Sequence, residues 1–139
     1  MIQRLQTVYM LLAVIIISLL FLLPFSNASR TNSGPFVDGD LDVYDNISLL
    51  SSVIAIALSG IINIFLYKNR RTQMLITIVL TLLSIETVTL ALVFTFTAAV
   101  SASVSVGIFI PLVSIVLFML AYRGIKKDDE LVKSSNRLR

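Results

Sequence analysis

Four long apolar runs dominate the chain and are separated by short polar stretches. The runs cover residues 8–25, 47–67, 72–97 and 104–122. Each is close to the ~20 residues that an α-helix needs to cross about 30 Å of hydrocarbon. Because backbone groups in lipid must be satisfied internally, and because the runs lack the two-residue alternation of a membrane barrel, each run is predicted to be a helix. The pattern therefore predicts an all-α membrane protein with four transmembrane helices.

The polar stretches set the arrangement of these helices. The turns at 68–71 and 98–103 are short, so the second, third and fourth helices are expected to be sequential antiparallel neighbours in a bundle. The longer stretch at 26–46 is rich in Ser, Asn, Gly and Asp, and Pro35 interrupts it, so it is expected to be irregular. Residues 1–139 thus form a single membrane domain with a loop at 26–46 and a tail at 123–139.

The basic residues predict an orientation. Ten of the eleven Lys and Arg residues lie on one side of the four runs, and Arg30 alone lies on the other. The positive-inside rule makes the first side cytoplasmic, so both termini are expected in the cytoplasm and the loop at 26–46 in the periplasm. Tyr9, Tyr67 and Tyr122 stand at the cytoplasmic ends of their runs, as interfacial tyrosines do.

Composition narrows the possible chemistry. The chain is 57% hydrophobic and 14% charged, and it contains no Cys and no His. Disulfides, thiolate nucleophiles, Cys/His metal sites and imidazole acid–base chemistry are therefore excluded. The start of the chain resembles a signal peptide with a cleavage site near Ala28, but three further runs follow, so we expect it to be retained as an anchor.

Small and weakly polar residues are spaced so that they lie along single faces of three predicted helices. In lipid, burying apolar side chains between helices gains little, because lipid tails are equally apolar. Helices therefore pair through small and weakly polar residues. The predicted packing residues are Ser52, Ala55, Ser59 and Asn63 in the second run, Thr77, Thr81 and Ser84 in the third, and Gly107, Pro111 and Ser114 in the fourth. Pro111 cannot donate a hydrogen bond to the carbonyl of Gly107, so a mild kink is expected there.

Glu86 is the only charged residue inside any apolar run. A carboxylate at that depth is costly, so it raises a functional hypothesis. At 100° per residue it lies opposite Thr77 and Ser84, among aliphatic neighbours. Three interpretations stay open: a structural glutamate, a contact to a second subunit, and a proton- or ion-linked site.

The tail is the second informative stretch. As a short helix it places Lys126, Glu130, Lys133 and Arg137 on one side, with Arg139 beyond, while Ile125, Leu131, Val132 and Leu138 gather on the other side, interrupted by Asp128. Two interpretations stay open. The tail is a basic helix lying on anionic lipid, or it docks a cytoplasmic partner or subunit.

The acidic segment Asp38-Gly-Asp40-Leu-Asp42 has the beginning of a calcium loop. The EF-hand pattern requires Gly at the sixth position and Glu at the twelfth, where this chain has Val43 and Leu49. No metal, cofactor or catalytic site is therefore predicted.

Three stretches resemble a family of bacterial proteins. They are Met1-Ile2-Gln3-Arg4-Leu5-Gln6-Thr7-Val8-Tyr9, Phe65-Leu66-Tyr67-Lys68-Asn69-Arg70-Arg71 and the tail from Arg123 through Asp128-Asp129-Glu130-Leu131 to Asn136-Arg137-Leu138-Arg139. The chain resembles four-span inner-membrane proteins grouped as domain of unknown function 4293. The resemblance implies four spans, the bacterial inner membrane and an uncleaved N-terminus. It implies no activity.

Together these observations favour a non-enzymatic accessory or assembly subunit of a larger inner-membrane complex. Its expected contacts are the lipid bilayer and other membrane subunits, with nucleic acid excluded by the lack of aromatic residues among the basic ones. The alternative is a small proton-coupled transporter or homo-oligomeric carrier that uses Glu86. The identity of a partner complex, the oligomeric state and the role of the acidic loop do not follow from the sequence.

Overall fold

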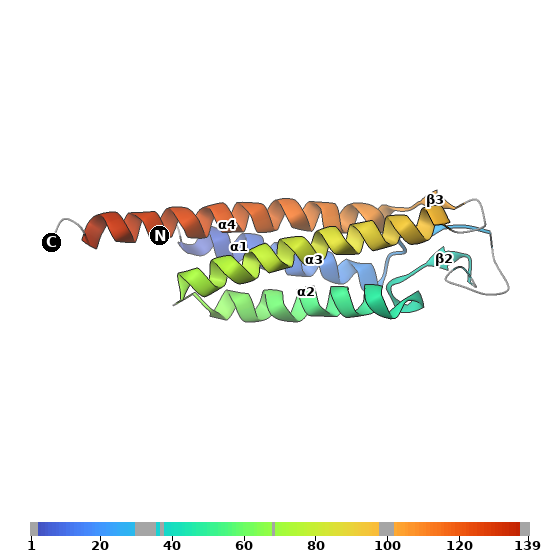
Figure 1. The fold of residues 1–139 in the computed structure, drawn as a ribbon, viewed down its shortest axis with the longest axis horizontal. Helices are drawn as coiled ribbons and strands as arrows, with labels where there is room; N and C mark the ends of the chain where they lie inside the picture. Colours follow the sequence, from blue (N-terminus) through green and yellow to red (C-terminus); the bar gives the residue numbers. More distant parts are fainter. Residues whose placement is uncertain (1–2, 30–35, 37, 68, 98–101, 137–139) are drawn as a thin grey trace.

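A computed structural model shows four helices packed side by side along one axis (Figure 1). It describes residues 3–29, 36, 38–67, 69–97 and 102–136. The helices are α1 (Gln3–Ser18), α2 (Ile47–Phe65), α3 (Arg70–Thr97) and α4 (Phe109–Asn136). Each helix runs antiparallel to the next, and both termini lie at the same end of the bundle (Figure 1). The predicted all-α bundle of four apolar helices is confirmed.

The bundle is a closed ring in which each helix packs against two others. α1 contacts α2 and α4, and α3 also contacts α2 and α4. Its interior is filled by residues such as Ile17, Leu49, Ile56, Leu80 and Phe118, all of which are fully buried. The outer surface is also apolar, with Leu58, Leu75 and Val116 each more than half exposed. A helix bundle that is apolar on both sides is matched to a lipid solvent rather than to water.

Helix length supports the same conclusion. Three helices are long and apolar enough to cross a membrane, and the segment Leu5–Phe21 is a shorter apolar helix. α1 ends at Ser18 and continues as a 3₁₀-helix, η1 (Leu19–Phe21), so the first helix stops before residue 25, where the apolar run ends. The protein is therefore a multi-pass membrane protein by helix length and hydropathy.

A small sheet closes the end of the bundle opposite the termini. It contains β1 (Ser26–Asn27), β2 (Asp40–Leu41) and β3 (Ser103–Val104), in the order β2-β1-β3 with antiparallel pairing. Phe25 N–H donates to Leu41 O at 2.8 Å, and Ser105 N–H donates to Phe25 O at 2.9 Å. The loop at 26–46, predicted to be irregular, thus contains two strands and the 3₁₀-helix η2 (Val43–Asp45). Strands of two residues are too short for any sequence periodicity to reveal them.

The start of α4 also differs from the prediction. Residues 103–104 form β3 and Val106–Ile108 form the 3₁₀-helix η3, so α4 begins at Phe109 rather than near residue 104. Pro111 therefore lies in the first turn of α4, where a missing N–H removes no intrahelical hydrogen bond. The reason for expecting a kink at Pro111 does not apply.

Gly107 lies where two loops come closest. Its N–H donates to Pro24 O at 3.1 Å. A Cβ atom at this position would stand 2.2 Å from the same carbonyl oxygen. Only glycine allows this approach, which joins the end of α1 to the start of α4.

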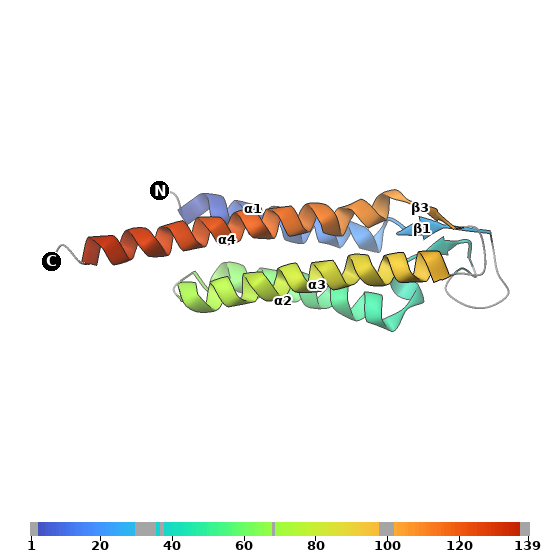
Figure 2. The same ribbon diagram turned by 45° about the horizontal axis from the view of Figure 1, so that its top comes forward.

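The tail continues α4 without a break to Asn136. The segment predicted as a short separate helix is thus the last part of one 28-residue helix. In Figure 2 its end projects beyond the ends of α2 and α3. The rest of the tail, 137–139, lies outside the described residues.

Candidate functional site

Polar side chains from all four helices meet inside the end of the bundle that carries the termini. We call this set the end cluster: Gln6, Asn63, Gln73, Thr77 and Asp128, whose exposed fractions are 8%, 0%, 5%, 0% and 6%. Polar groups that are buried in a protein nearly always make hydrogen bonds. The contacts of these five residues therefore determine how this end of the bundle is held together.

Asp128 ties the tail to two other helices. Gln6 Nε2 of α1 donates a short hydrogen bond to Asp128 Oδ2. Arg70 Nη1, from the first turn of α3, donates to the backbone carbonyl of Asp128 at 2.6 Å. Gly124, one turn earlier, also faces Gln6, and a Cβ there would make an ordinary contact of 3.4 Å with Gln6 Cβ. The tail is thus fixed to the bundle as far as Asp128.

A second set of contacts joins α2 to α3. Asn63 Nδ2 donates to Thr77 Oγ1 at 2.9 Å, and Gln73 Nε2 donates to Asn63 O at 3.3 Å. Met10 Sδ of α1 lies 3.9 Å from Asn63 Nδ2 and 3.8 Å from Gln73 Nε2. Because thioether sulfur is a weak acceptor, the Asn63–Thr77 bond is the main polar link here.

Two buried oxygens in the end cluster have no partner among the described residues. They are Gln6 Oε1 and Asn63 Oδ1. A buried acceptor without a hydrogen bond costs about 1–3 kcal/mol, so each is a place where a water or a ligand donor would bind favourably.

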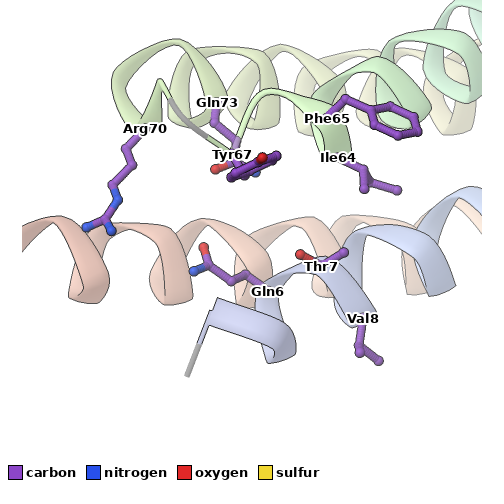
Figure 3. Close-up of a pocket in the computed structure, with 8 residues that line it drawn as sticks. All are labelled: Gln6, Thr7, Val8, Ile64, Phe65, Tyr67, Arg70 and Gln73. Carbon is purple, nitrogen blue, oxygen red and sulfur yellow. The ribbon is translucent and has the colours of Figure 1, made fainter. Parts of the chain in front are cut away.

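A groove of about 530 Å³ opens beside the end cluster (Figure 3). Its lining residues come from α1, from the end of α2 and the turn after it, and from the start of α3: Gln6, Thr7, Val8, Ile64, Phe65, Tyr67, Arg70 and Gln73. Figure 3 shows Arg70 reaching from α3 toward α4, with Gln6 on the α1 side. The lining supplies one cation, amides and hydroxyls. Such groups can bind a polar ligand, and they offer no general base.

Further hydroxyl contacts link the helices toward the sheet. Thr87 Oγ1 donates to Ser52 Oγ at 3.1 Å, Ser114 Oγ to Ser84 Oγ at 3.3 Å, and Thr95 Oγ1 to Ser26 Oγ at 2.9 Å. Among the predicted packing residues, Ser52, Asn63, Thr77, Ser84, Gly107, Pro111 and Ser114 are buried, and Ala55, Ser59 and Thr81 are half-buried. Small polar residues therefore lie at the interior contacts between helices.

Glu86 lies on the outer side of α3, away from the end cluster. Its side chain is exposed, and so are its neighbours Leu82 at 59% and Val93 at 48%. Within the described part of the chain no hydrogen bond or ion pair reaches it. In a bilayer this carboxylate would face lipid or another polypeptide.

The predicted contact residues of the tail lie partly on its free surface. Lys126 and Glu130 are exposed, and Lys133 Nζ lies 2.5 Å from Asp129 Oδ2. Lys126 and Glu130, which are four positions apart, form no ion pair, whereas the hydrogen bond from Lys133 lowers the pKa of Asp129. Leu131 and Val132 are 51% and 45% exposed. Arg137 and Arg139 lie outside the described residues.

The family described as Domain of unknown function (DUF4293) matches residues 2–138. The chain belongs to this family. No curated protein and no solved structure matches the chain. The family's description attaches no activity to the end cluster or to any other part of the chain.

In this DUF4293 protein, four aspartates of the acidic loop lie close together in and around β2: Asp38, Asp40, Asp42 and Asp45. Asp42 N–H donates to Asp45 Oδ2 at 2.6 Å. Burial raises the pKa of Asp42, and the negative charges of Asp45, Asp40 and Asp38 raise it further. No group of three or more acids poised to hold a metal occurs among the residues that the structure describes.

Sequence reasoning missed most of the end cluster. Asn63 and Thr77 belong to the predicted packing faces, whereas Gln6, Gln73 and Asp128 do not. One signal was present: Asp128 interrupts the apolar side of the tail, and Gln73 extends the Thr77 face by one turn. Both positions place a polar residue on a face that packs inward.

Proposed function

We propose that this protein is a non-enzymatic accessory or assembly subunit of a larger complex in the bacterial inner membrane. The observation that carries the proposal is the anchored tail of α4. It is fixed to α1 and α3 through Asp128 and then continues beyond the bundle (Figure 2). A helix held in this way presents its last turns in a defined direction, so little conformational entropy is lost when a partner binds.

The exposed surface of the tail has two different faces. Lys126, Glu130 and Lys133 lie on one face, and the exposed Leu131 and Val132 point away from it. An apolar face on a helix that leaves its own bundle needs another surface to cover it. The charged face would set the orientation of a partner, and the apolar face would supply the binding energy.

Glu86 supports a second contact inside the membrane. An unpaired carboxylate that faces lipid is costly, and a hydrogen-bond donor from a partner helix would remove much of that cost. Glu86 and the tail lie on different parts of the molecule, so one partner could contact both only if it extends from the membrane into the cytoplasm.

The cytoplasmic location of both termini is part of the proposal. Arg70, Arg71, Arg123, Lys126, Lys127 and Lys133 lie in the parts of α3 and α4 nearest the termini, in agreement with the positive-inside rule. Reporter fusions at the C-terminus and in the loop at 26–46 test this. A periplasmic signal from the C-terminus would refute the orientation.

The subunit proposal is tested by site-specific photo-crosslinking in native membranes. A photoreactive residue is introduced at Leu131, at Glu86 and, as a control, at Phe109, which is 58% exposed near the opposite end of the bundle. We expect Leu131 and Glu86 to crosslink to discrete proteins that also co-purify in mild detergent, and Phe109 to give no such product. Recovery of only the monomer or a homo-oligomer would refute the proposal.

The alternative is a proton-coupled carrier. Because Glu86 faces outward, it could line a pathway only between copies of this chain. Reconstitution in liposomes with a pH-sensitive dye, comparing the parent with Glu86→Gln, distinguishes the two. Proton flux that depends on Glu86 would favour the carrier, and the absence of flux from both proteins would exclude it.

A further inference from the structure

A second groove, of about 550 Å³, lies on the outer surface between α3 and α4. Its α3 side is formed by Ile78, Thr81, Leu82 and Ile85, and its α4 side by Met119, Tyr122, Arg123 and Lys126. Leu82 and Met119 are 59% and 52% exposed, so the groove opens toward the surroundings of the bundle rather than into its core.

The groove changes in character along its length. Because α3 and α4 are antiparallel, Ile85 and Met119 lie toward the middle of the bundle, whereas Ile78, Arg123 and Lys126 lie toward the end with the termini. The four α4 residues span seven positions, or about 10 Å of helix. One end of the groove is therefore apolar, and the other end carries two cations, with Tyr122 also in the lining.

Neither cation is neutralised within the described part of the chain. Arg123 and Lys126 are both exposed, and no described carboxylate lies within ion-pair distance of either. Among the nearby acids, Asp128 accepts a hydrogen bond from Gln6 and Asp129 pairs with Lys133, while Glu130, four positions after Lys126, is exposed and forms no ion pair with it. Two cations at the end of an apolar groove are complementary to an anion that is attached to an apolar group.

We propose that this groove is a binding site for one anionic phospholipid. An acyl chain would lie along Leu82, Ile85 and Met119, and the phosphate would contact Arg123 and Lys126. The planar Arg guanidinium suits two phosphate oxygens, and the Lys ammonium acts as a point charge. Basic pockets between transmembrane helices at a membrane surface recognise anionic headgroups in this way. This inference goes beyond the subunit proposal and does not depend on a partner complex.

The absence of Trp from the chain allows a site-specific test. Met119→Trp places a single Trp fluorophore in the groove. The full chain is reconstituted in phosphatidylcholine vesicles that contain nitroxide-labelled phosphatidylglycerol or, in parallel, phosphatidylcholine with the same label. We expect stronger quenching by the phosphatidylglycerol, with a preference of about fivefold for each cation that contacts the phosphate.

Matched variants separate a site from general surface charge. In the Met119→Trp background, Arg123→Gln with Lys126→Gln should remove the preference. Arg71→Gln with Lys127→Gln removes the same residue types from outside the groove and should retain it. Equal losses in both double variants, or no preference in the parent, would overturn the proposal.

One further outcome is decisive. Equal exclusion of both lipids from the fluorophore would indicate that another helix occupies the groove, and it would also overturn the lipid assignment. If Met119→Trp fails to fold, Ile78→Trp on the facing side of the groove provides the same measurement, since Ile78 is 42% exposed.

Discussion

Gln6 and Asp128 are 122 residues apart in the chain, and the side-chain amide of one donates a buried hydrogen bond to the carboxylate of the other. The bond joins the first helix to the tail of the last. With Arg70 on the backbone carbonyl of Asp128, it makes the tail part of the bundle. The proposed partner surface and the proposed lipid-binding groove both depend on this position of α4.

Asp128→Ala should destabilise the bundle and release the tail. Hydrogen bonds to charged groups contribute about 1.5–3 kcal/mol, and the change leaves the buried Gln6 amide without its acceptor. The free energy of unfolding in detergent is measured for the parent, Asp128→Ala, Gln6→Ala and the double variant. This double-mutant cycle should give a coupling energy of about 1–3 kcal/mol. Asp129→Ala, which removes only a surface ion pair, should change stability by less than about 1 kcal/mol. Additive effects of the two core changes would show that the bond does not stabilise the protein.

Gly107→Ala should lower the melting temperature, because its Cβ would stand 2.2 Å from Pro24 O and the backbone must move. Gly124→Ala is the matched control. Its Cβ would meet Gln6 Cβ at 3.4 Å, an ordinary contact, and alanine favours helix by about 0.5–1 kcal/mol. We therefore expect opposite signs in thermal-shift measurements. Equal destabilisation would contradict the close approach of the two loops.

Asn63→Ala should destabilise the α2–α3 contact by about 1 kcal/mol, since interhelical hydrogen bonds in membranes contribute about 0.6–2 kcal/mol. The loss is partly offset because the substitution also removes the buried, unpartnered Oδ1 atom of Asn63. Ser59→Ala, one turn earlier on α2, serves as the comparison and should be near neutral, because the Ser59 side chain makes no hydrogen bond to the described residues. Denaturant titration in mixed micelles gives both values, and a larger loss at Ser59 would refute the assignment.

Protonation of Asp42, which directly follows β2, should stabilise the folded loop beside the sheet. The pKa of Asp42 is raised above 3.8 in the folded protein, so between 3.8 and the raised value the folded state binds more protons than the unfolded state. Stability therefore falls as pH rises through that window and levels off above it. Hydrogen exchange at the Phe25 and Ala28 amides, which bond to Leu41 O and Gly39 O, reports this directly.

Two variants check the cause of that pH dependence. Asp42→Asn should remove it, whereas Asp40→Asn should only weaken it, because Asp40 contributes one of several neighbouring charges. An unchanged pH profile in Asp42→Asn would assign the effect to another group.

Much of this fold follows from local properties of the chain. Apolar runs of sufficient length must form helices in lipid, and short turns make consecutive helices antiparallel. Helical spacing also predicted that Glu86 lies opposite Thr77 and Ser84, and in the bundle Glu86 is exposed while Thr77 and Ser84 are buried. These properties depend only on residue type and on 3.6 residues per turn.

What the sequence by itself determined is the number of helices, their alternating direction, the packing faces of three of them and the outward side of Glu86. Only the tertiary structure decided which inward residues meet. Three hydrogen bonds join residues that are far apart in the chain: Gln6 with Asp128, Ser26 with Thr95, and Gly107 with Pro24. Each pairing depends on how two elements far apart in the chain are positioned relative to each other, and no local pattern encodes this. For the same reason the tail, whose charges suggested a separate surface helix, became the anchored end of α4.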